Sequence, residues 1–130
     1  MAIDHIRLSQ TARDQLVTLK RRTGIAHWNV LCRWAFTRSL AEPAPPPGTK
    51  LVLDSSVEMS WRVFAGDHGD LYWALLRFRC HTDGLGLDEE TLANQFRLHL
   101  HRGIGYLVGD PQVTSVTGLA GLAIQEEPAA

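Results

Sequence analysis

Apolar residues recur at intervals of three and four in four stretches of the chain, and each stretch predicts an amphipathic helix. Ser9 and Asp88 suit the N-caps of the first and last of these helices, and Gly24 can end the first helix by taking the left-handed conformation. The predicted helices cover residues 9–24, 24–40, 71–80 and 88–107. The third helix is expected to turn four residues toward the core, namely Leu71, Ala74, Leu75 and Phe78.

Shorter segments with alternating apolar and polar residues predict a small β-component. Residues 50–53 and 57–64 are expected to pair as a β-hairpin, and residues 3–8 are expected to form a short N-terminal strand or an extended arm. The proline-rich run 42–48 predicts a stiff connector, because proline lacks the amide donor that a helix requires.

Together these elements predict a mainly α (α+β) fold, a compact helical domain of about four helices with a short β-hairpin and an N-terminal strand. We expect residues 1–112 to form this single domain. Residues 113–130 are small, weakly patterned and uncharged until Glu126, which predicts a loosely ordered C-terminal tail.

The second helix, residues 24–40, has more apolar and aromatic surface than one chain of this length needs to hide. Leu31 and Trp34 lie on that surface. We therefore expect a homo-oligomer with these two residues at the subunit interface.

The sequence has no uncharged apolar run long enough to span a membrane, and its N-terminus lacks the apolar core of a secretory signal, so we expect a cytoplasmic protein. Cys32 and Cys80 each lie in an apolar helix-like run, without a Cys or His at metal-ligand spacing. We expect both to be reduced, buried and structural. The alternative is a redox or sulfur-handling thiol, which requires an electropositive and partly exposed setting.

The net charge of −1 conceals an asymmetry along the chain. Residues 1–40 carry seven basic and two acidic residues, a net +5, whereas residues 41–130 carry six basic and twelve acidic residues, a net −6. A basic pole on an otherwise acidic chain indicates a polyanion bound at one face. A solvated face balanced by the acidic half of the fold explains the same charges equally well.

The candidate phosphate contacts lie on the first helix and at its C-terminal end. They are Arg13, Lys20, Arg21 and Arg22, with Arg7 and Arg33 at the rim. Because the first helix turns its apolar residues inward, we expect Arg13 and Lys20, which are seven residues apart, to lie on the same outward side. The competing interpretation is that the three consecutive cations only complement the dipole at the helix C-terminus.

Motifs for catalysis are missing from the sequence: it lacks a phosphate-binding glycine motif, a nucleophile elbow and a cysteine pair at metal spacing. His99 and His101 are two residues apart, which on a helix turns them about 200° from each other and prevents joint ligation of a metal. We therefore expect a protein that is not an enzyme.

Six blocks, which span most of residues 6–107, are Ile6–Ser9, Ala12–Ile25, Asn29–Phe36, Arg38–Leu40, Trp61–Gly66 and Leu98–Ile104. Taken together and in order, they resemble the DndE family of the bacterial DNA phosphorothioation (sulfur modification) system. None of the blocks is a catalytic signature, so the resemblance rests on their order and combined length. The chain departs from the family pattern in its longer proline-rich connector and in its C-terminal tail.

The resemblance implies a non-catalytic, DNA-binding component of the complex that replaces a non-bridging phosphate oxygen of DNA with sulfur. It also implies a homotetramer that favours duplex DNA carrying a nick. Sulfur mobilisation would belong to a cysteine desulfurase and an iron–sulfur sulfurtransferase, and nucleotide hydrolysis to an ATPase. No cofactor is therefore expected in this chain.

Two other interpretations stay open at this point. Residues 3–40 also resemble a ribbon-helix-helix repressor, in which a strand carrying Arg7 would enter the major groove. The protein could instead be an interaction scaffold that docks its basic pole on an acidic protein without contacting DNA. Salt-dependent binding to unrelated DNA sequences favours the DndE interpretation, an operator preference favours the repressor, and the absence of DNA binding favours the scaffold.

Overall fold

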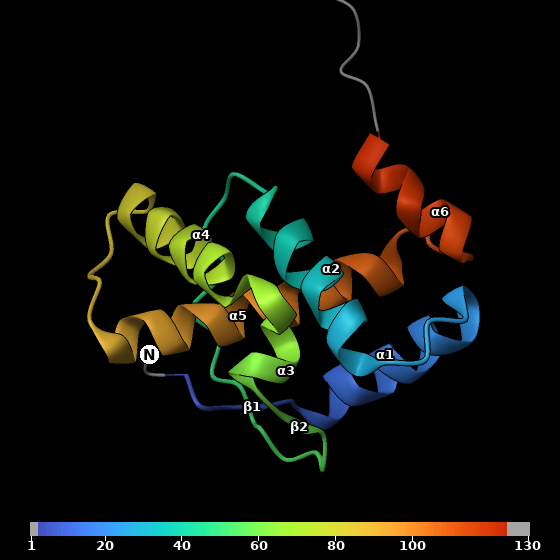
Figure 1. The fold of residues 1–130 in the computed structure, drawn as a ribbon, viewed down its shortest axis with the longest axis horizontal. Coiled ribbons are helices and arrows are strands. Elements are labelled where there is room, and N and C mark those ends of the chain that lie inside the picture. Colours follow the sequence, from blue (N-terminus) through green and yellow to red (C-terminus); the bar gives the residue numbers. More distant parts are fainter. Residues whose placement is uncertain (1–2, 125–130) are drawn as a thin grey trace, which may run out of the picture.

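Two crossing helices, α2 and α5, form the centre of the molecule. The computed structural model describes residues 3–124. Figure 1 shows α5 running across the molecule behind α2, with α4 beside its N-terminal half and α1 and α6 toward its C-terminal end. The elements follow in the order β1 (His5–Arg7), α1 (Gln10–Thr23), α2 (Trp28–Leu40), β2 (Glu58–Ser60), α3 (Trp61–Ala65), η1 (Gly66–His68), α4 (Gly69–Thr82), α5 (Glu89–Gly109), α6 (Val116–Gly121) and η2 (Leu122–Ile124).

The contact between α2 and α5 requires a glycine. An ideal Cβ atom at Gly103 would lie 1.7 Å from the carbonyl oxygen of Ala35, so the two helices approach backbone to backbone. Beside this contact, the ring of Phe36 packs against those of Phe64 and Phe96, at centroid distances of 5.9 and 5.1 Å. The predicted mainly α architecture is confirmed. Within residues 3–124, every helix is too short or too polar to cross a lipid bilayer.

The ends of α1 and the start of α5 lie where the capping residues predict them. The Ser9 hydroxyl accepts the backbone N–H of Ala12 at 3.1 Å, and the Asp88 carboxylate caps α5. Gly24 ends α1 with φ +74°, and its N–H donates to the carbonyl of Lys20 at 2.9 Å. These caps act within one helical turn, which is why the sequence predicts them correctly.

The predicted β-hairpin is wrong, whereas the N-terminal strand is confirmed. β1 pairs antiparallel with β2, with Ile6 opposite Met59, and residues 50–53 form no strand. The later part of the predicted strand 57–64 is the helix α3, which Ser60 caps. Pairing between β1 and β2 buries Ile6 and Met59 in the core, and local alternation of residues does not reveal a partner so distant in sequence.

The predicted core face of α4 is also wrong. Leu71 and Phe78 are 55% and 71% exposed, and the residues that α4 buries are Leu76, Arg79 and Cys80. The helix carries two apolar stripes, and the stripe that includes its aromatic rings Tyr72 and Trp73 packs against the core. The other stripe is left on the surface.

Part of the predicted loose tail is folded. Val113 and Leu119 are fully or almost fully buried, and α6 packs against α1. Ser115 caps α6 by accepting the N–H of Gly118 at 3.0 Å. The rest of the predicted tail, residues 125–130, lies outside the described residues.

A buried polar cluster joins the end of α2 to α5. Arg102 donates to the hydroxyl and to the carbonyl of Ser39, at 2.9 and 2.8 Å, and the same hydroxyl lies 2.8 Å from Nδ1 of His99. Because arginine can only donate, Ser39 accepts from Arg102 and donates to a neutral His99. Burial, together with the nearby charges of Arg79 and Arg102, lowers the pKa of His99 to about 4.

This histidine is expected to make the protein less stable in mild acid. The unfolded chain takes up a proton near the ordinary pKa of 6.5, whereas folded His99 takes one up only near 4. The free energy of unfolding should therefore fall as the pH drops from 6.5 to 4 and level off below, by roughly 3 kcal/mol from this group. Urea unfolding at a series of pH values measures the loss. In His99→Gln the free energy of unfolding should vary less with pH, whereas in the control His81→Gln, at an exposed site, it should vary as in the wild type. Equal pH dependence in the wild type and in His99→Gln would refute the assignment of this loss to His99.

Candidate nucleic-acid interface

The cationic end of α1 sends its three side chains in different directions, because successive residues of a helix turn by about 100°. Lys20 points toward α2, where its Nζ lies 4.1 Å from the ring centre of Trp28. Arg22 points the other way and donates from Nη1 to the carbonyl of Val108 at 2.8 Å. Arg21 is exposed, and within residues 3–124 it has no hydrogen-bond or ion-pair partner.

The three cations at the end of α1 therefore have different roles. Arg22 binds a carbonyl in the last turn of α5, so it complements the negative end of that helix and ties α5 to α1. Lys20 makes a cation–π contact that leaves its ammonium hydrogens available to other acceptors. Lys20 and Arg21, which we call the α1 cation pair, are therefore the two cations of the cluster that can meet a phosphate.

The other three predicted contact residues do not join the α1 cation pair directly. Arg13 lies two turns earlier on α1, with Nη1 3.4 Å from the Asp14 carboxylate. Arg7 is on β1, 2.7 Å from the Glu58 carboxylate, which balances its charge. Arg33 is on α2 and reaches toward the α3–η1 junction, on a different side of α2 from Trp28.

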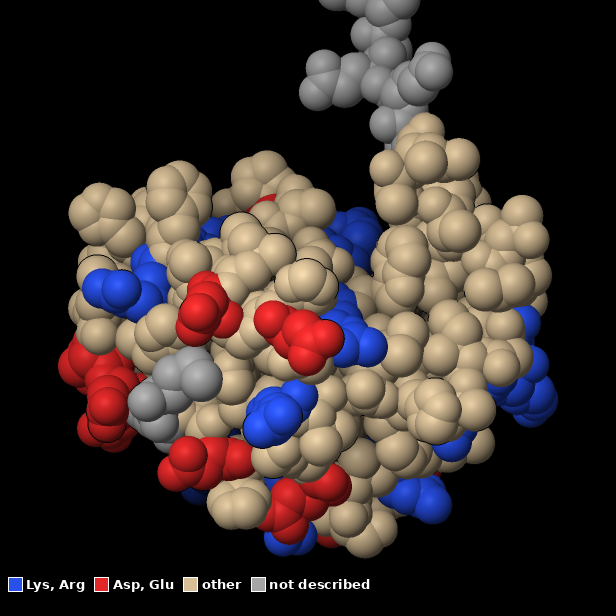
Figure 2. Space-filling view, viewed as in Figure 1, with Lys and Arg blue, Asp and Glu red and all other residues tan. Residues whose placement is uncertain are grey.

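The space-filling view shows how the charges are distributed. In Figure 2, a group of Lys and Arg atoms lies at the lower right-hand edge of the molecule, where α1 ends, whereas the Lys and Arg atoms on the left-hand side lie close to Asp and Glu atoms. On the face shown, this group, which we call the basic edge, has few acidic neighbours, and such a surface is suited to a polyanion.

The predicted oligomer interface changes in one respect. Leu31 is completely buried within the single chain, so it has no surface to offer a second copy, and this part of the prediction is wrong. Trp34 is half-buried on the outer side of α2 and lines two hollows, one with Arg33 and Tyr72 and one with Leu122 and Ala123 of η2. Trp34 therefore stays a candidate for contact with a second copy.

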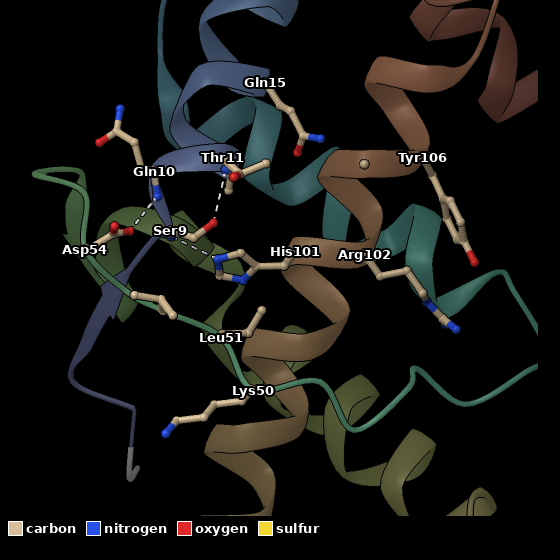
Figure 3. Close-up of a pocket in the computed structure, with 13 residues that line it drawn as sticks. Ser9, Gln10, Thr11, Gln15, Lys50, Leu51, Asp54, His101, Arg102 and Tyr106 are labelled. Carbon is tan, nitrogen blue, oxygen red and sulfur yellow. Dashed lines mark hydrogen bonds between the residues drawn. The ribbon is translucent and has the colours of Figure 1, made fainter.

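An open hollow of about 640 Å³ lies between the start of α1, the segment 50–54 and α5 (Figure 3). Its most reactive pair of side chains is Ser9 and His101, but both are engaged. Nε2 of His101 accepts the backbone N–H of Ser9 at 3.1 Å, and Nδ1 donates to the carbonyl of Arg97 at 2.7 Å. Because the Ser9 hydroxyl caps α1, the pair lacks the contact between hydroxyl and imidazole that nucleophilic catalysis needs.

Cys32 and Cys80 are buried, as predicted, and neither forms a disulfide. Burial raises the pKa of the Cys32 thiol to about 12, and burial with the nearby Asp83 charge raises the pKa of Cys80. Both residues therefore stay protonated near neutral pH, a state that disfavours attack on sulfur donors. Residues 3–124 contain no group of three side chains placed to hold a metal ion.

Sequence reasoning missed the residues that hold the basic edge together. Trp28 follows Lys20 by eight residues, beyond the glycine that ends α1, so no helical spacing connects them. The partner of Arg22 is a backbone carbonyl, and no residue type at Val108 would have indicated it. A tryptophan four residues after the helix-ending glycine was the signal available in the sequence.

Comparison with known proteins gives a consistent picture. The family model described as "DNA sulphur modification protein DndE" matches residues 5–115. The crystal structure of DndE from Escherichia coli B7A, involved in DNA phosphorothioation modification, is similar with a TM-score of 0.69 and 26% identity, over 82% of this chain and 98% of that chain. A crystal structure of a DndE mutant involved in DNA phosphorothioation has a TM-score of 0.65 and 21% identity over the same shares, which supports the fold alone. No curated protein matches the chain.

The family match covers most of the chain, from the first strand to the N-cap of α6. It contains the α1 cation pair and the contact between α2 and α5, whereas α6 itself lies beyond it. The fold likeness to a DndE crystal structure extends over nearly all of that structure's chain. On this evidence, the chain belongs to the DndE family of DNA sulfur modification proteins.

Proposed function

We propose that this protein is the non-catalytic, DNA-binding component of a DNA phosphorothioation complex, and that it holds duplex DNA, preferentially at a nick, through the C-terminal end of α1. The observation that carries the proposal is the α1 cation pair. Arg21 is exposed without a partner in residues 3–124, and Lys20 beside it keeps its ammonium hydrogens available. Both lie in the last turn of α1.

The proposed contact is with phosphates rather than with bases. Lysine and arginine side chains on a convex helix end can meet backbone phosphates, which carry the sequence-independent part of DNA affinity. A nicked duplex keeps almost the whole of this phosphate surface. Arg13, further along the same helix, would extend the contact, while Arg22 supports it by fixing α1 to α5.

The sulfur chemistry is assigned to partner proteins. The thiols of Cys32 and Cys80 are buried and their pKa values are raised, so neither is suited to carry sulfur. We propose that a cysteine desulfurase and a sulfurtransferase of the Dnd system mobilise the sulfur and that a Dnd ATPase hydrolyses nucleotide. In this division of labour the present chain needs no cofactor.

We further propose that the protein acts as a homotetramer. One α1 cation pair offers few phosphate contacts, but symmetric copies repeat the pair along the DNA, and linked weak contacts add up to a usable affinity. Trp34 on the outer side of α2 is one candidate contact between copies.

The ribbon-helix-helix interpretation is disfavoured by β1. In that fold a strand of one copy pairs with the same strand of a second copy, and the ribbon reads bases. Here the hydrogen-bonding partner of β1 is β2 of the same chain, and Arg7 is bonded to Glu58. The scaffold interpretation differs from our proposal in predicting no DNA binding.

The double substitution Lys20→Ala with Arg21→Ala tests the proposal. It should weaken binding to unrelated duplexes alike and reduce the slope of log affinity against log salt by about 2 units, since each lost phosphate contact contributes about 0.9. Fluorescence anisotropy with intact and nicked duplexes at several salt concentrations measures both effects. Arg22 is left unchanged because its loss would also release α5.

The matched control is Lys50→Ala with Arg62→Ala, which removes two exposed cations from other parts of the surface. This variant should keep the wild-type affinity and salt slope. If the α1 double variant binds like the wild type, or if both variants lose binding equally, the α1 cation pair is not the DNA contact. If the wild-type protein binds no DNA, the DNA-binding proposal is wrong and the scaffold interpretation is favoured.

A further inference from the structure

The start of α2 places an aromatic ring beside the α1 cation pair. Trp28, the first residue of α2, is half-buried, and the Nζ atom of Lys20 lies 4.1 Å from its ring centre. In Figure 1 the chain turns back from the end of α1 and begins α2 between α1 and α3, and α2 contacts both of these helices. An aromatic ring next to cations is typical of sites for unpaired nucleotides, because the ring stacks on the base while the cations meet the phosphates.

A hollow of about 190 Å³ borders this ring, and we call it the Trp28 hollow. Its other walls come from the residues that flank Trp28 at the start of α2 and from Met59 and Val63, on β2 and α3. Its volume is below the range of about 300–1,000 Å³ that is usual for drug-sized ligands. A single planar base suits a hollow of this size, whereas the sugar and the phosphates would stay outside it, beside Lys20.

The lining of the Trp28 hollow favours a neutral base over a phosphate. None of the described residues that line it is a lysine or an arginine, and its charged residue is Glu58. The Glu58 carboxylate lies 2.7 Å from Nη2 of Arg7 and 3.3 Å from Nδ1 of His5. A carboxylate at the wall repels a phosphate, while the apolar side chains of Met59 and Val63 suit the flat face of a base.

Two polar side chains at the same hollow can meet the edge of a base. His27 and Asn29 flank Trp28 and line the hollow, and within residues 3–124 neither side chain has a hydrogen-bond or ion-pair partner. An amide and a neutral imidazole each offer both a donor and an acceptor. Every base carries donors or acceptors on its edge, so these groups allow binding without selecting one base, as is usual where stacking supplies the affinity.

We propose that the Trp28 hollow takes one unstacked base of the DNA, from a nucleotide at the nick, while the phosphate of that nucleotide lies on Lys20 and Arg21. The base stacks on the indole of Trp28, on the face that Lys20 does not cover. This inference rests on the proposed function and names the feature of a nick that the protein binds. A nucleotide beside a break in the strand leaves the stack at a lower cost than one within an intact strand. A preference for nicked duplex follows.

The first test compares three duplexes of one sequence by fluorescence anisotropy: intact, nicked, and nicked with an abasic nucleotide on each side of the nick. The wild type should bind the abasic nicked duplex about tenfold more weakly than the nicked one, since stacking one base on an aromatic side chain contributes roughly 5- to 150-fold in affinity. Both nicked duplexes carry the same phosphates, so the α1 cation pair alone would bind them equally. Equal binding overturns the proposal.

Substitution of Trp28 assigns the effect to the ring. Trp28→Leu should bind the two nicked duplexes alike and keep the salt slope of the wild type, because the phosphate contacts stay in place. Trp28→Phe keeps an aromatic ring and should retain a smaller difference between the two duplexes. Circular dichroism checks that both variants fold. A folded Trp28→Leu variant that still distinguishes the abasic duplex as the wild type does overturns the proposal.

A second variant fills the hollow without changing Trp28 or the α1 cation pair. Val63 is 51% exposed and lines the hollow, so Val63→Met places a longer side chain there and should remove the difference between the two nicked duplexes. Val52→Met is the matched control, because Val52 is 63% exposed and lines the hollow at the start of α1 instead. It should behave as the wild type. Equal behaviour of the two variants contradicts the proposal.

Photochemical cross-linking reports on the geometry. A 5-bromouracil base placed at the nick should cross-link under ultraviolet light to the peptide that contains Trp28, whereas the same base placed well within the intact part of the duplex should not. Mass spectrometry of the digested adduct identifies the peptide. Cross-links of equal yield from both positions, or an adduct confined to other peptides, would place the base elsewhere and refute the proposal.

The results separate the base site from the proposed phosphate contacts. Lys20→Ala with Arg21→Ala should weaken binding to all three duplexes and still bind the nicked duplex more tightly than the abasic one. A wild type that binds intact duplex but does not distinguish the two nicked duplexes refutes the base site alone. A wild type that binds none of the three refutes the proposed DNA binding as well.

Discussion

Gly103→Ala is expected to destabilise the protein by about 4 kcal/mol or more and to leave little folded protein at 37 °C. The added methyl group would lie 1.7 Å from the carbonyl oxygen of Ala35. Overpacking against side chains usually costs about 1–3 kcal/mol, because a side chain can move aside. Here the obstacle is the backbone of α2, so the two central helices must separate. Urea unfolding followed by circular dichroism measures the loss.

Gly105 supplies the control on the same helix. A Cβ atom at Gly105 meets nothing within 4 Å, so Gly105→Ala should stabilise α5 by about 1 kcal/mol through the better helix propensity of alanine. Opposite signs for the two substitutions would establish that the close approach of α2 and α5, rather than helix propensity, requires glycine at 103. If Gly103→Ala is as stable as the wild type, the helices are not in backbone contact.

Arg79→Ala is expected to cost about 3–5 kcal/mol, the usual range when one partner of a buried ion pair is removed. The guanidinium donates to the carbonyls of Leu40 and Ala44 at 3.0 and 2.9 Å, and to the Asp83 carboxylate at 2.8 Å. Without it, the carbonyl of Leu40 loses its arginine donor and the carbonyl of Ala44 keeps only Arg102. A buried carboxylate is also left unpaired.

The neighbouring residue Arg77 provides the comparison. It is exposed on the same helix, so Arg77→Ala should change the free energy of unfolding by no more than about 0.5 kcal/mol. Urea unfolding of the two variants, with limited proteolysis of the connector, gives the readout. Faster cleavage within residues 41–50 is expected in Arg79→Ala alone. Equal stability of both variants would mean that the connector is held by other contacts.

Two arginines hold the proline-rich connector against the helices. Arg79 from α4 and Arg102 from α5 both donate to the carbonyl of Ala44. Proline lacks an amide donor, so a proline-rich segment offers more carbonyl acceptors than N–H donors to the rest of the fold. Two arginines supply the donors that this segment lacks, and they fix its path across the ends of α2 and α4.

Local signals predicted much of the helical part of the fold. Ser9, Gly24 and Asp88 are capping residues whose partners lie within one turn, so the ends of α1 and the start of α5 could be identified before any tertiary contact was known. The basic end of α1 and the burial of both cysteines were predicted for the same reason, since helical spacing alone separates an apolar side from a charged one.

Where the same pattern of apolar residues allowed two ways of packing an element, the sequence alone did not determine which one forms. α4 has two apolar stripes, and only the position of α5 decides that Leu76 is buried and Phe78 exposed. The strand partner of Ile6 lies more than fifty residues away, so the local alternation over residues 50–64 suggested a hairpin that does not form. Pairing of strands and choice of helix face depend on contacts distant in sequence, which residue periodicity does not record.

In the candidate site, too, some features follow from the sequence and others from the tertiary structure. The sequence of residues 20–22 determines that α1 ends in three cations, and membership of the DndE family is carried by the order of blocks along the chain. The tertiary structure decides which cations are available: Trp28 lies under Lys20, the carbonyl of Val108 takes Arg22, and Arg21 is left exposed. The charge of a side chain follows from its residue type. Whether that side chain is free to bind a phosphate depends on the acceptors and rings that other segments place beside it.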